Sequence, residues 1–235
     1  MKSRLPFPVL YEDREVLVID KPAGMLTTQT RAKERNTAEA WLNDYVRKGQ
    51  LRSRLRVWLV HRLDRETSGV MMFARTEAVA ESFRSNWAEL TEKTYLARVA
   101  GELAEPEGEF ESWLREDADG YRVRSVPAPR GGADASRRTG GGPVAKLART
   151  AWRRLVVGGG TTLVEVSLKS GRKNQIRVHF SEAGHPLVGD AKYGGPSARR
   201  LCLHAVRLRF RHPRTGRWLE FESPPPAELR IPESA

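Results

Sequence analysis

The sequence predicts an α+β fold with one large mixed, mostly antiparallel sheet. Many short apolar stretches with strand-like alternation are joined by a few helical patterns at irregular intervals. The chain of 235 residues is long enough to bury a sizeable core. We expect one folded domain over residues 9–226, with an N-terminal extension over 1–8 and a C-terminal tail over 227–235.

Strands are predicted where apolar residues alternate, or run together, between turn residues. Pro22 and Gly24 end the second strand, because proline cannot continue a ladder and glycine permits a tight turn. Glycines 158–160 and the pair Thr215–Gly216 predict hairpin turns. The expected strands cover residues 9–13, 16–20, 56–60, 70–74, 93–101, 151–157, 161–168 and 201–206, with a last hairpin over 210–221.

Two segments have the spacing of amphipathic helices. From Thr37 to Tyr45, apolar residues share one face at i, i+3, i+4 and i+7. From Thr76 to Leu90, apolar positions again recur at helical spacing. Thr37 and Thr76 are each placed to cap the first turn.

The charge balance predicts a polyanionic partner. Lys and Arg number 41 against 29 Asp and Glu, a formal net charge of +12. Residues 169–217 hold twelve basic and two acidic side chains, so positive charge is concentrated in the second half. A codon bias toward arginine would explain many arginines but not the scarcity of acids beside them. Nucleic acid is therefore the expected partner.

A Gly-, Pro- and Arg-rich stretch over residues 126–143 predicts a flexible basic loop, because such a composition cannot bury a core. It is either a tolerated insertion or a segment that orders against RNA phosphates. The strand patterns on both sides look like parts of one sheet, so we place no domain boundary here.

A single carboxylate, Asp64, lies between two apolar strand patterns, with arginine on both sides and a Thr-Ser-Gly turn after it. A carboxylate on such a connection lies at a sheet edge, where it can meet a ligand. Local features alone also fit an Asx-type turn in which Gly69 supplies an unusual backbone angle.

The stretch His61-Arg62-Leu63-Asp64-Arg65-Glu66-Thr67-Ser68-Gly69 resembles the HRLDxxTSG signature of the RluA family of pseudouridine synthases. Residues 93–101 resemble the KxYxAxVxG segment of that family, and residues 169–180 resemble TGRxHQIRVH. The third segment departs from the family at Ser170 and Asn174, which replace threonine and histidine. The resemblance covers residues 9–226, and we therefore expect no separate N-terminal RNA-binding module of the kind that many members carry.

The resemblance implies a sheet bisected by an active-site cleft, and it implies catalytic roles for three residues. Asp64 is the expected nucleophile, Tyr95 the residue that stacks on the target base and assists proton removal, and Arg177 the cation paired with Asp64. By the local pattern alone, Arg177 and His179 would alternate on a strand with a solvated basic face. Further substrate or RNA contacts are expected from Arg62, which would fill the vacated stack, and from Ile176, His61, Thr67, Arg172 and Gln175.

The implied reaction moves uracil from an N1 to a C5 linkage in a uridine of a transfer or ribosomal RNA stem-loop. It needs no metal, nucleotide or other cofactor, and the five histidines lack metal-ligand spacing. The single cysteine, Cys202, excludes an internal disulfide and is expected to be buried. We expect a cytoplasmic monomer without a membrane-spanning or secretory segment.

Two other function classes fit parts of the same pattern. A non-catalytic RNA-binding or ribosome-assembly factor on this fold would need the same basic surface. A glycoside or nucleoside hydrolase would need a second carboxylate, for which Glu66 is the nearby candidate. The joint presence of Asp64, Tyr95 and Arg177 favours the synthase.

Overall fold

A computed structural model describes residues 5–29, 34–48, 50, 52–129, 144–168 and 170–231. The chain folds as two compact units, the first made of Met1–Tyr95 with Leu203–Pro225 and the second of Leu96–Cys202 with Pro226–Ala235. Both contain strands and helices, which confirms the α+β class. Most of the predicted basic loop, residues 130–143, lies outside the described residues, as do 1–4 and 232–235.

The first unit is built on a mixed sheet. Its strands are β1 (Val9–Glu12), β2 (Val16–Lys21), β3 (Trp58–Leu59), β4 (Ser68–Ala74), β10 (Leu203–Arg211), β11 (Trp218–Glu222) and the first half of β5 (Thr91–Ala100). The order is β1-β2-β4-β10-β5, with β3 on β4 and β11 on β10. β10 pairs with β4 in parallel. β2 pairs with β4 on its other side and is antiparallel to it, with Ile19 opposite Met71. The strand predicted over 56–60 is only two residues long.

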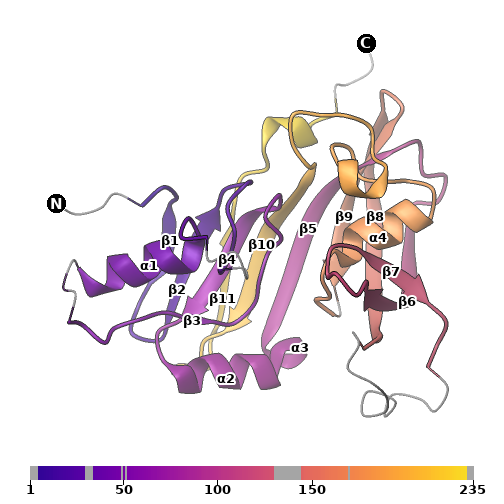
Figure 1. Cartoon of the computed structure of the whole chain (residues 1–235). Helices are drawn as coiled ribbons and strands as arrows, with labels where there is room; N and C mark the ends of the chain where they lie inside the picture. The colour runs from indigo at the N-terminus through magenta and orange to yellow at the C-terminus, as the bar shows by residue number, and fades with distance from the viewer. Residues whose placement is uncertain are drawn as a thin grey trace. The chain divides into compact units, whose positions relative to one another are not determined.

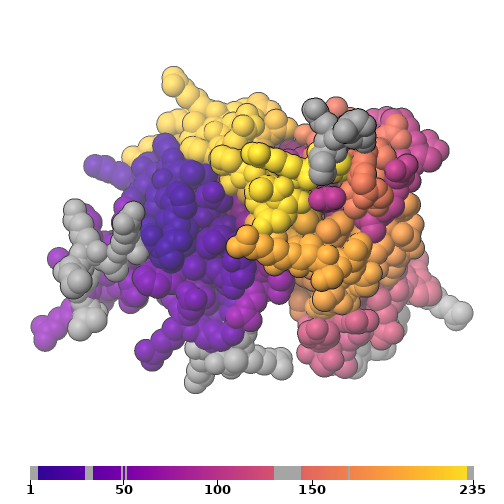
Figure 2. Space-filling model, turned by 90° about the horizontal axis from the view of Figure 1, so that it is seen from above, coloured from indigo at the N-terminus to yellow at the C-terminus, as the bar shows by residue number. Residues whose placement is uncertain are grey.

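β4 is buried along its whole length, so both faces of the sheet are covered at this strand. Val70 and Met72 pack with Ala80 and Phe83 of the helix α2 (Glu77–Ser85) in one core cluster. Figure 1 shows α2 and α1 (Ala38–Arg47) beside the strands of this unit. In the space-filling view, the indigo N-terminal residues lie against the gold β10–β11 hairpin (Figure 2), where His212 Nε2 is 2.7 Å from Asp13 Oδ2.

The predicted helix caps are confirmed. Thr37 Oγ1 accepts a hydrogen bond from Ala40 N–H at 3.1 Å, and Thr76 Oγ1 accepts one from Val79 N–H at 3.3 Å. The prediction of a single helix from Thr76 to Leu90 is wrong, because α2 ends at Ser85 and a short helix α3 (Trp87–Leu90) follows. At Asn86 the backbone leaves the helical conformation, with φ −122° and ψ 29°. Its N–H and its side-chain Nδ2 both donate to the Ser82 carbonyl, at 3.2 and 2.9 Å.

The second unit contains the rest of β5 and four further strands in the order β5-β9-β8-β6-β7, with β9, β8, β6 and β7 antiparallel in turn. These strands are β6 (Glu107–Glu116), β7 (Val123–Val126), β8 (Lys146–Gly158) and β9 (Thr161–Leu168). β8 and β9 form the hairpin predicted at glycines 158–160. Short 3-10 helices η2 (Ala191–Tyr193) and η3 (Ala227–Leu229) complete the unit. Leu229 is buried against Cys202, itself buried as expected, so folded structure continues past Pro226.

Residues 175–182 form a helix, α4 (Gln175–Glu182), so the local strand interpretation of this stretch is wrong. α4 packs against β7 and β8 (Figure 1). Arg177 and His179 are both buried rather than solvated. Their polar atoms are paired with residues distant in the sequence, for example His179 Nδ1 with Thr150 Oγ1 at 2.8 Å, and only the folded chain supplies such partners. No helix in the described ranges is long and apolar enough to cross a membrane.

Candidate active site

Asp64 lies on the connection between β3 and β4 in the first unit, where its side chain is half-buried. The carbonyl of Asp64 accepts a hydrogen bond from Thr67 N–H at 3.2 Å, which closes a turn just before β4 begins at Ser68. A carboxylate on a short turn between strands of a buried sheet is held by a rigid scaffold and remains accessible.

The residue before Asp64 is fixed by a buried threonine. The Thr27 hydroxyl donates to the Leu63 carbonyl at 2.8 Å and accepts from Leu63 N–H at 3.2 Å. Both polar groups of the Leu63 backbone are therefore satisfied by one side chain. Because an unpaired buried backbone group costs about 1–3 kcal/mol, this pair of bonds strongly favours one position of the turn.

The residue after Asp64 is fixed from the other side by the turn that ends β2. Gly24 N–H donates to the Arg65 carbonyl at 2.8 Å. The fully buried ammonium of Lys21 donates to the carbonyls of Met25 at 2.7 Å, Pro22 at 2.9 Å and Arg65 at 3.3 Å. In the sequence, Lys21 is marked only by its place before the Pro22 turn, and its role as an anchor becomes visible in the folded chain.

Gly69 brings β4 against β10. Its φ is +116°, and a Cβ at this position would lie 2.2 Å from the Ala205 carbonyl oxygen. Only glycine allows this backbone angle together with this approach. Beside it, Ser68 Oγ lies 2.8 Å from Nδ1 of buried His204, which extends the contact between the two strands. The unusual backbone angle expected at Gly69 is confirmed.

His61 is engaged within the protein. Its Nε2 accepts a hydrogen bond from Met72 N–H at 3.1 Å, and its ring centroid lies 4.9 Å from that of Trp87. Burial, and secondarily the charge of Lys93, hold the pKa of His61 well below its ordinary value. These contacts favour a structural role over the expected RNA contact. Thr67 is likewise buried.

Arg62 and Tyr95 have side-chain polar groups that make no hydrogen bond or ion pair within the described residues. Arg62 is exposed, and its guanidinium makes no ion pair within the described part of the chain. The Tyr95 ring is buried on β5, but its hydroxyl makes no hydrogen bond with the residues that the structure describes. Lys93 lies 5.6 Å from the Tyr95 ring centroid. Both side chains therefore keep polar groups that a ligand can use.

In the second unit, Arg177 forms a buried bidentate ion pair with Asp190. Its Nε lies 2.7 Å from Asp190 Oδ2, and its Nη2 lies 2.7 Å from Asp190 Oδ1. The side chains are 5% and 0% exposed. Asp190 has no role in the sequence-based prediction, which paired Arg177 with Asp64. The pairing of Arg177 with Asp64 stays a prediction.

The neighbours of Arg177 on α4 differ in their availability. Gln175 accepts through Oε1 from Ser170 Oγ and Arg172 N–H, and donates through Nε2 to Arg149 O and Thr150 Oγ1. Its amide is thus used to hold the start of α4, which favours a structural role. Ile176 is buried, whereas Arg172 is exposed and donates to the Leu147 carbonyl at 3.2 Å.

Asn174, where the family has histidine, has a φ of +52° at the start of α4. Asparagine adopts this left-handed conformation more readily than most residues, which fits the substitution. Its Nδ2 donates to the Tyr193 hydroxyl at 3.0 Å.

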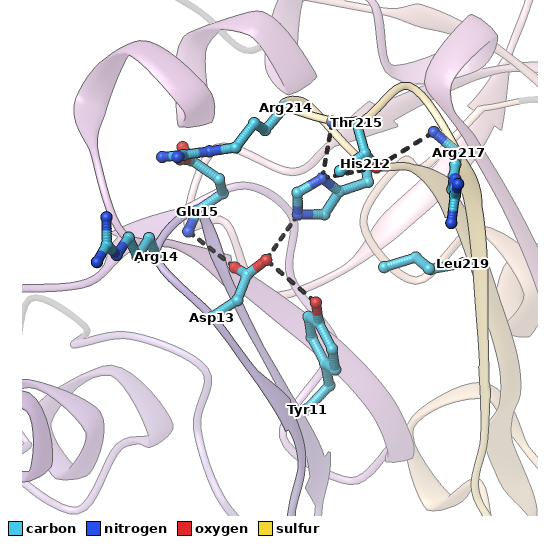
Figure 3. A pocket seen from close by; sticks show the side chains of 9 residues that line it. All are labelled: Tyr11, Asp13, Arg14, Glu15, His212, Arg214, Thr215, Arg217 and Leu219. Carbon is cyan, nitrogen blue, oxygen red and sulfur yellow. Dashed lines mark hydrogen bonds and ion pairs between the residues drawn. The ribbon is translucent and has the colours of Figure 1, made fainter.

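A pocket of about 380 Å³ lies in the first unit at the far end of β4 from Asp64. In Figure 3, Asp13 and His212 meet at its centre, and none of the sequence-predicted site residues lines it. Burial alone would raise the pKa of Asp13, but hydrogen bonds from Val16 N–H, Glu15 N–H, His212 and Tyr11 outweigh it and hold that pKa below its usual value. β4 separates this pocket from the Asp64 turn by about 20 Å of strand.

Within the described residues, no group of three or more His, Cys, Asp or Glu side chains could hold a metal ion.

Comparison with known proteins gives a consistent result. Residues 15–182 match the family model described as RNA pseudouridylate synthase. An uncharacterized RNA pseudouridine synthase of Chloroflexus aurantiacus is 37% identical over 90% of this chain and 64% of its own length. Ribosomal large subunit pseudouridine synthase D of Nitrosomonas europaea is 35% identical over 96% of this chain and 64% of its own. The chain thus spans slightly less than two thirds of these relatives.

The structure is also similar to a solved one. Human RNA Pseudouridylate Synthase Domain Containing 1 superposes with a TM-score of 0.65 at 25% identity, over 93% of this chain and 83% of the human chain.

Proposed function

Because this chain belongs to the RNA pseudouridylate synthase family, we propose that it isomerises uridine to pseudouridine in RNA with Asp64 as the nucleophile. The glycosidic bond from ribose C1′ to N1 of uracil breaks, and a bond from C1′ to C5 forms. The proton at C5 leaves and N1 gains a proton, so no oxidant, reductant or phosphoryl donor takes part. A carboxylate beside the reacting carbons, at C1′ or at C6 of the base, is the group that this chemistry requires.

The observation that carries the assignment is the anchoring of the Asp64 turn. Leu63 is fixed by Thr27, and Arg65 is fixed by Gly24 and Lys21, so the backbone on both sides of the carboxylate is held by buried hydrogen bonds. A nucleophile whose backbone is fixed is already placed to attack C1′ or C6. A displacement of the catalytic group by about 1 Å can lower the rate about a hundredfold.

Three further residues complete the proposed mechanism. Arg177 keeps the Asp64 carboxylate ionised and oriented, since a cation within about 4–6 Å favours the charged form. Tyr95 stacks on the target base and assists removal of the C5 proton. Arg62, exposed and without an ion-pair partner in the described chain, enters the stack from which the uridine has turned out, a step that costs a few kcal/mol.

Ribosomal RNA of the large subunit is the substrate to test first, because several relatives carry that name, among them the protein of Nitrosomonas europaea. A stem-loop of transfer RNA is the second candidate. The positive net charge of +12 fits either polyanion.

The test is tritium release from RNA labelled at uridine C5 and purified from cells that lack this protein. We expect release by the wild type and none by Asp64→Asn, which is nearly isosteric and keeps RNA binding. Glu66→Gln is the matched control, because it makes the same carboxylate-to-amide change two residues away. Arg177→Lys is expected to lose activity, since an ammonium does not reproduce the guanidinium fork.

Tight RNA binding without release by the wild type would favour the non-catalytic RNA binder. Release of free uracil that stops in Glu66→Gln would favour a hydrolase. Full activity of Arg177→Lys would contradict the proposed pairing alone.

A further inference from the structure

The pocket shown in Figure 3 joins two turns to which the proposed mechanism assigns no role. Its volume is about 380 Å³, and all of its lining residues belong to the first unit. One wall comes from the end of β1 and the turn that follows, and the other comes from the β10–β11 hairpin. In that order the lining residues are Tyr11, Asp13, Arg14 and Glu15, then His212, Arg214, Thr215, Arg217 and Leu219.

Asp13 and His212 form the centre of the pocket, and both are engaged within the protein. Two backbone N–H groups donate to Asp13 Oδ1 at 2.8 Å each, while the Tyr11 hydroxyl and His212 Nε2 donate to Oδ2 at 3.1 and 2.7 Å. Thr215 N–H donates to His212 Nδ1 at 3.2 Å, which assigns the ring proton to Nε2. These bonds hold the two turns together, and they leave Asp13 and His212 without a free polar atom for a ligand.

The arginines of the pocket divide into one that is paired and two that are not. Arg214 donates to the Glu15 carboxylate from Nε at 2.8 Å and also from Nη2. The side chains of Arg14 and Arg217 are exposed and make no hydrogen bond or ion pair within the described part of the chain. Figure 3 shows these two arginines on opposite sides of the pocket. Two guanidinium groups are therefore available to an anion.

The arrangement indicates the chemical class of that anion. A guanidinium binds phosphate through charge-assisted, paired hydrogen bonds, which an ammonium does not reproduce. Two arginines on opposite sides of a pocket do not converge on one phosphate. They match a ligand that carries phosphates at regular intervals, as a nucleic acid strand does.

We propose that Arg14 and Arg217 bind two different backbone phosphates of the substrate RNA, at a site separate from the catalytic turn. This inference rests on the proposed function, which makes RNA the partner. About 20 Å of β4 separates the pocket from Asp64, so the contacted phosphates lie several nucleotides from the target uridine. Phosphate contacts fix register and orientation without reading bases, so the site contributes affinity rather than sequence choice.

The test compares Arg14→Gln, Arg217→Gln and the double variant with the control Arg54→Gln. Arg54 is an exposed arginine of the same unit, lies outside the pocket and also has no side-chain partner among the described residues. The control therefore removes the same charge elsewhere. For each protein we measure the Kd for unmodified substrate RNA from about 0.05 to 0.4 M salt, the KM and kcat of tritium release, and the melting temperature.

We expect each single variant to reduce the slope of log K against log salt by about 0.7–0.9, the value for one phosphate contact. At about 0.1 M salt this corresponds to a Kd about five- to eightfold higher, and to about 25- to 60-fold for the double variant. The loss should appear in KM rather than kcat, because the contact is made equally before and during the reaction. Melting temperatures should stay within about 2 °C of the wild type.

A wild-type Kd and salt slope in the double variant would overturn the proposal. An equal loss in Arg54→Gln would attribute the effect to net charge and would also overturn it. Uridine monophosphate is titrated into the same proteins as a free phosphate ester. Binding of this nucleotide that the double variant loses, with the RNA Kd unchanged, would assign the pocket to a small molecule instead.

Failure of the proposed function has a different signature. A wild type that binds RNA but releases no tritium would contradict the synthase activity, while the salt slopes of the variants would still decide whether Arg14 and Arg217 contact phosphates.

Discussion

Replacing Gly69 by alanine tests how closely β4 and β10 approach beside the catalytic turn. The new Cβ would lie 2.2 Å from the Ala205 carbonyl oxygen, at a φ of +116°. A non-glycine residue at positive φ costs about 1–3 kcal/mol, and forcing an extra methyl group into a packed region costs about 1–3 kcal/mol more. We expect the free energy of unfolding to fall by about 2–6 kcal/mol, the sum of the two terms.

Gly24→Ala is the matched control, because Gly24 has a φ of +84° but nothing within 4 Å of its added Cβ. Gly24→Ala therefore has the free-energy cost of a positive φ but not that of a steric clash. Both variants reduce the conformational entropy of the unfolded chain by the same amount, so this contribution cancels in the comparison. Since about 2–4 °C corresponds to 1 kcal/mol in a chain of this size, and the clash alone costs about 1–3 kcal/mol, Gly69→Ala should melt about 2–12 °C below Gly24→Ala. Equal melting temperatures in thermal unfolding would refute the close approach.

Two further predictions concern the residues around Asp64. Burial lowers the pKa of His61 in the folded chain. Below about pH 6.5 the unfolded chain therefore binds a proton at His61 that the folded chain does not bind. As the pH is lowered through this range, the free energy of unfolding decreases by up to about 1.4 kcal/mol per pH unit. His61→Gln should therefore lose stability less steeply than the wild type in urea unfolding at pH 7.5 and 5.5, and equal slopes would contradict the assignment. Thr27→Val leaves both backbone groups of Leu63 unpaired. At about 1–3 kcal/mol for each group, the free energy of unfolding should fall by about 2–6 kcal/mol, and tritium release should slow. Unchanged release would show that catalysis does not depend on this anchor.

Features whose physical cause lies within a few residues, such as helix caps and hairpin turns, could be predicted from the sequence. Thr37 and Thr76 cap their helices because a threonine hydroxyl reaches the first free N–H groups of its own segment. The glycines after β8 turn a hairpin because the turn conformation is set by those residues alone. The apolar spacing did not predict the division of the helix at Asn86, because that spacing continues across the one residue whose backbone is not helical.

The amino-acid sequence by itself determined the α+β class, the place of Asp64 between two strands and the need for glycine at position 69, because these depend on short-range pattern and backbone angle. Only the tertiary structure determined which residues pair with the buried polar and charged side chains. Arg177 and His179 alternate as on a strand, but residues 175–182 form a helix in which both side chains are buried. Their partners, Asp190 and Thr150, are brought to α4 only by the fold. A buried charge or polar group is stable only with its partner, so its role follows from contacts that no local pattern contains.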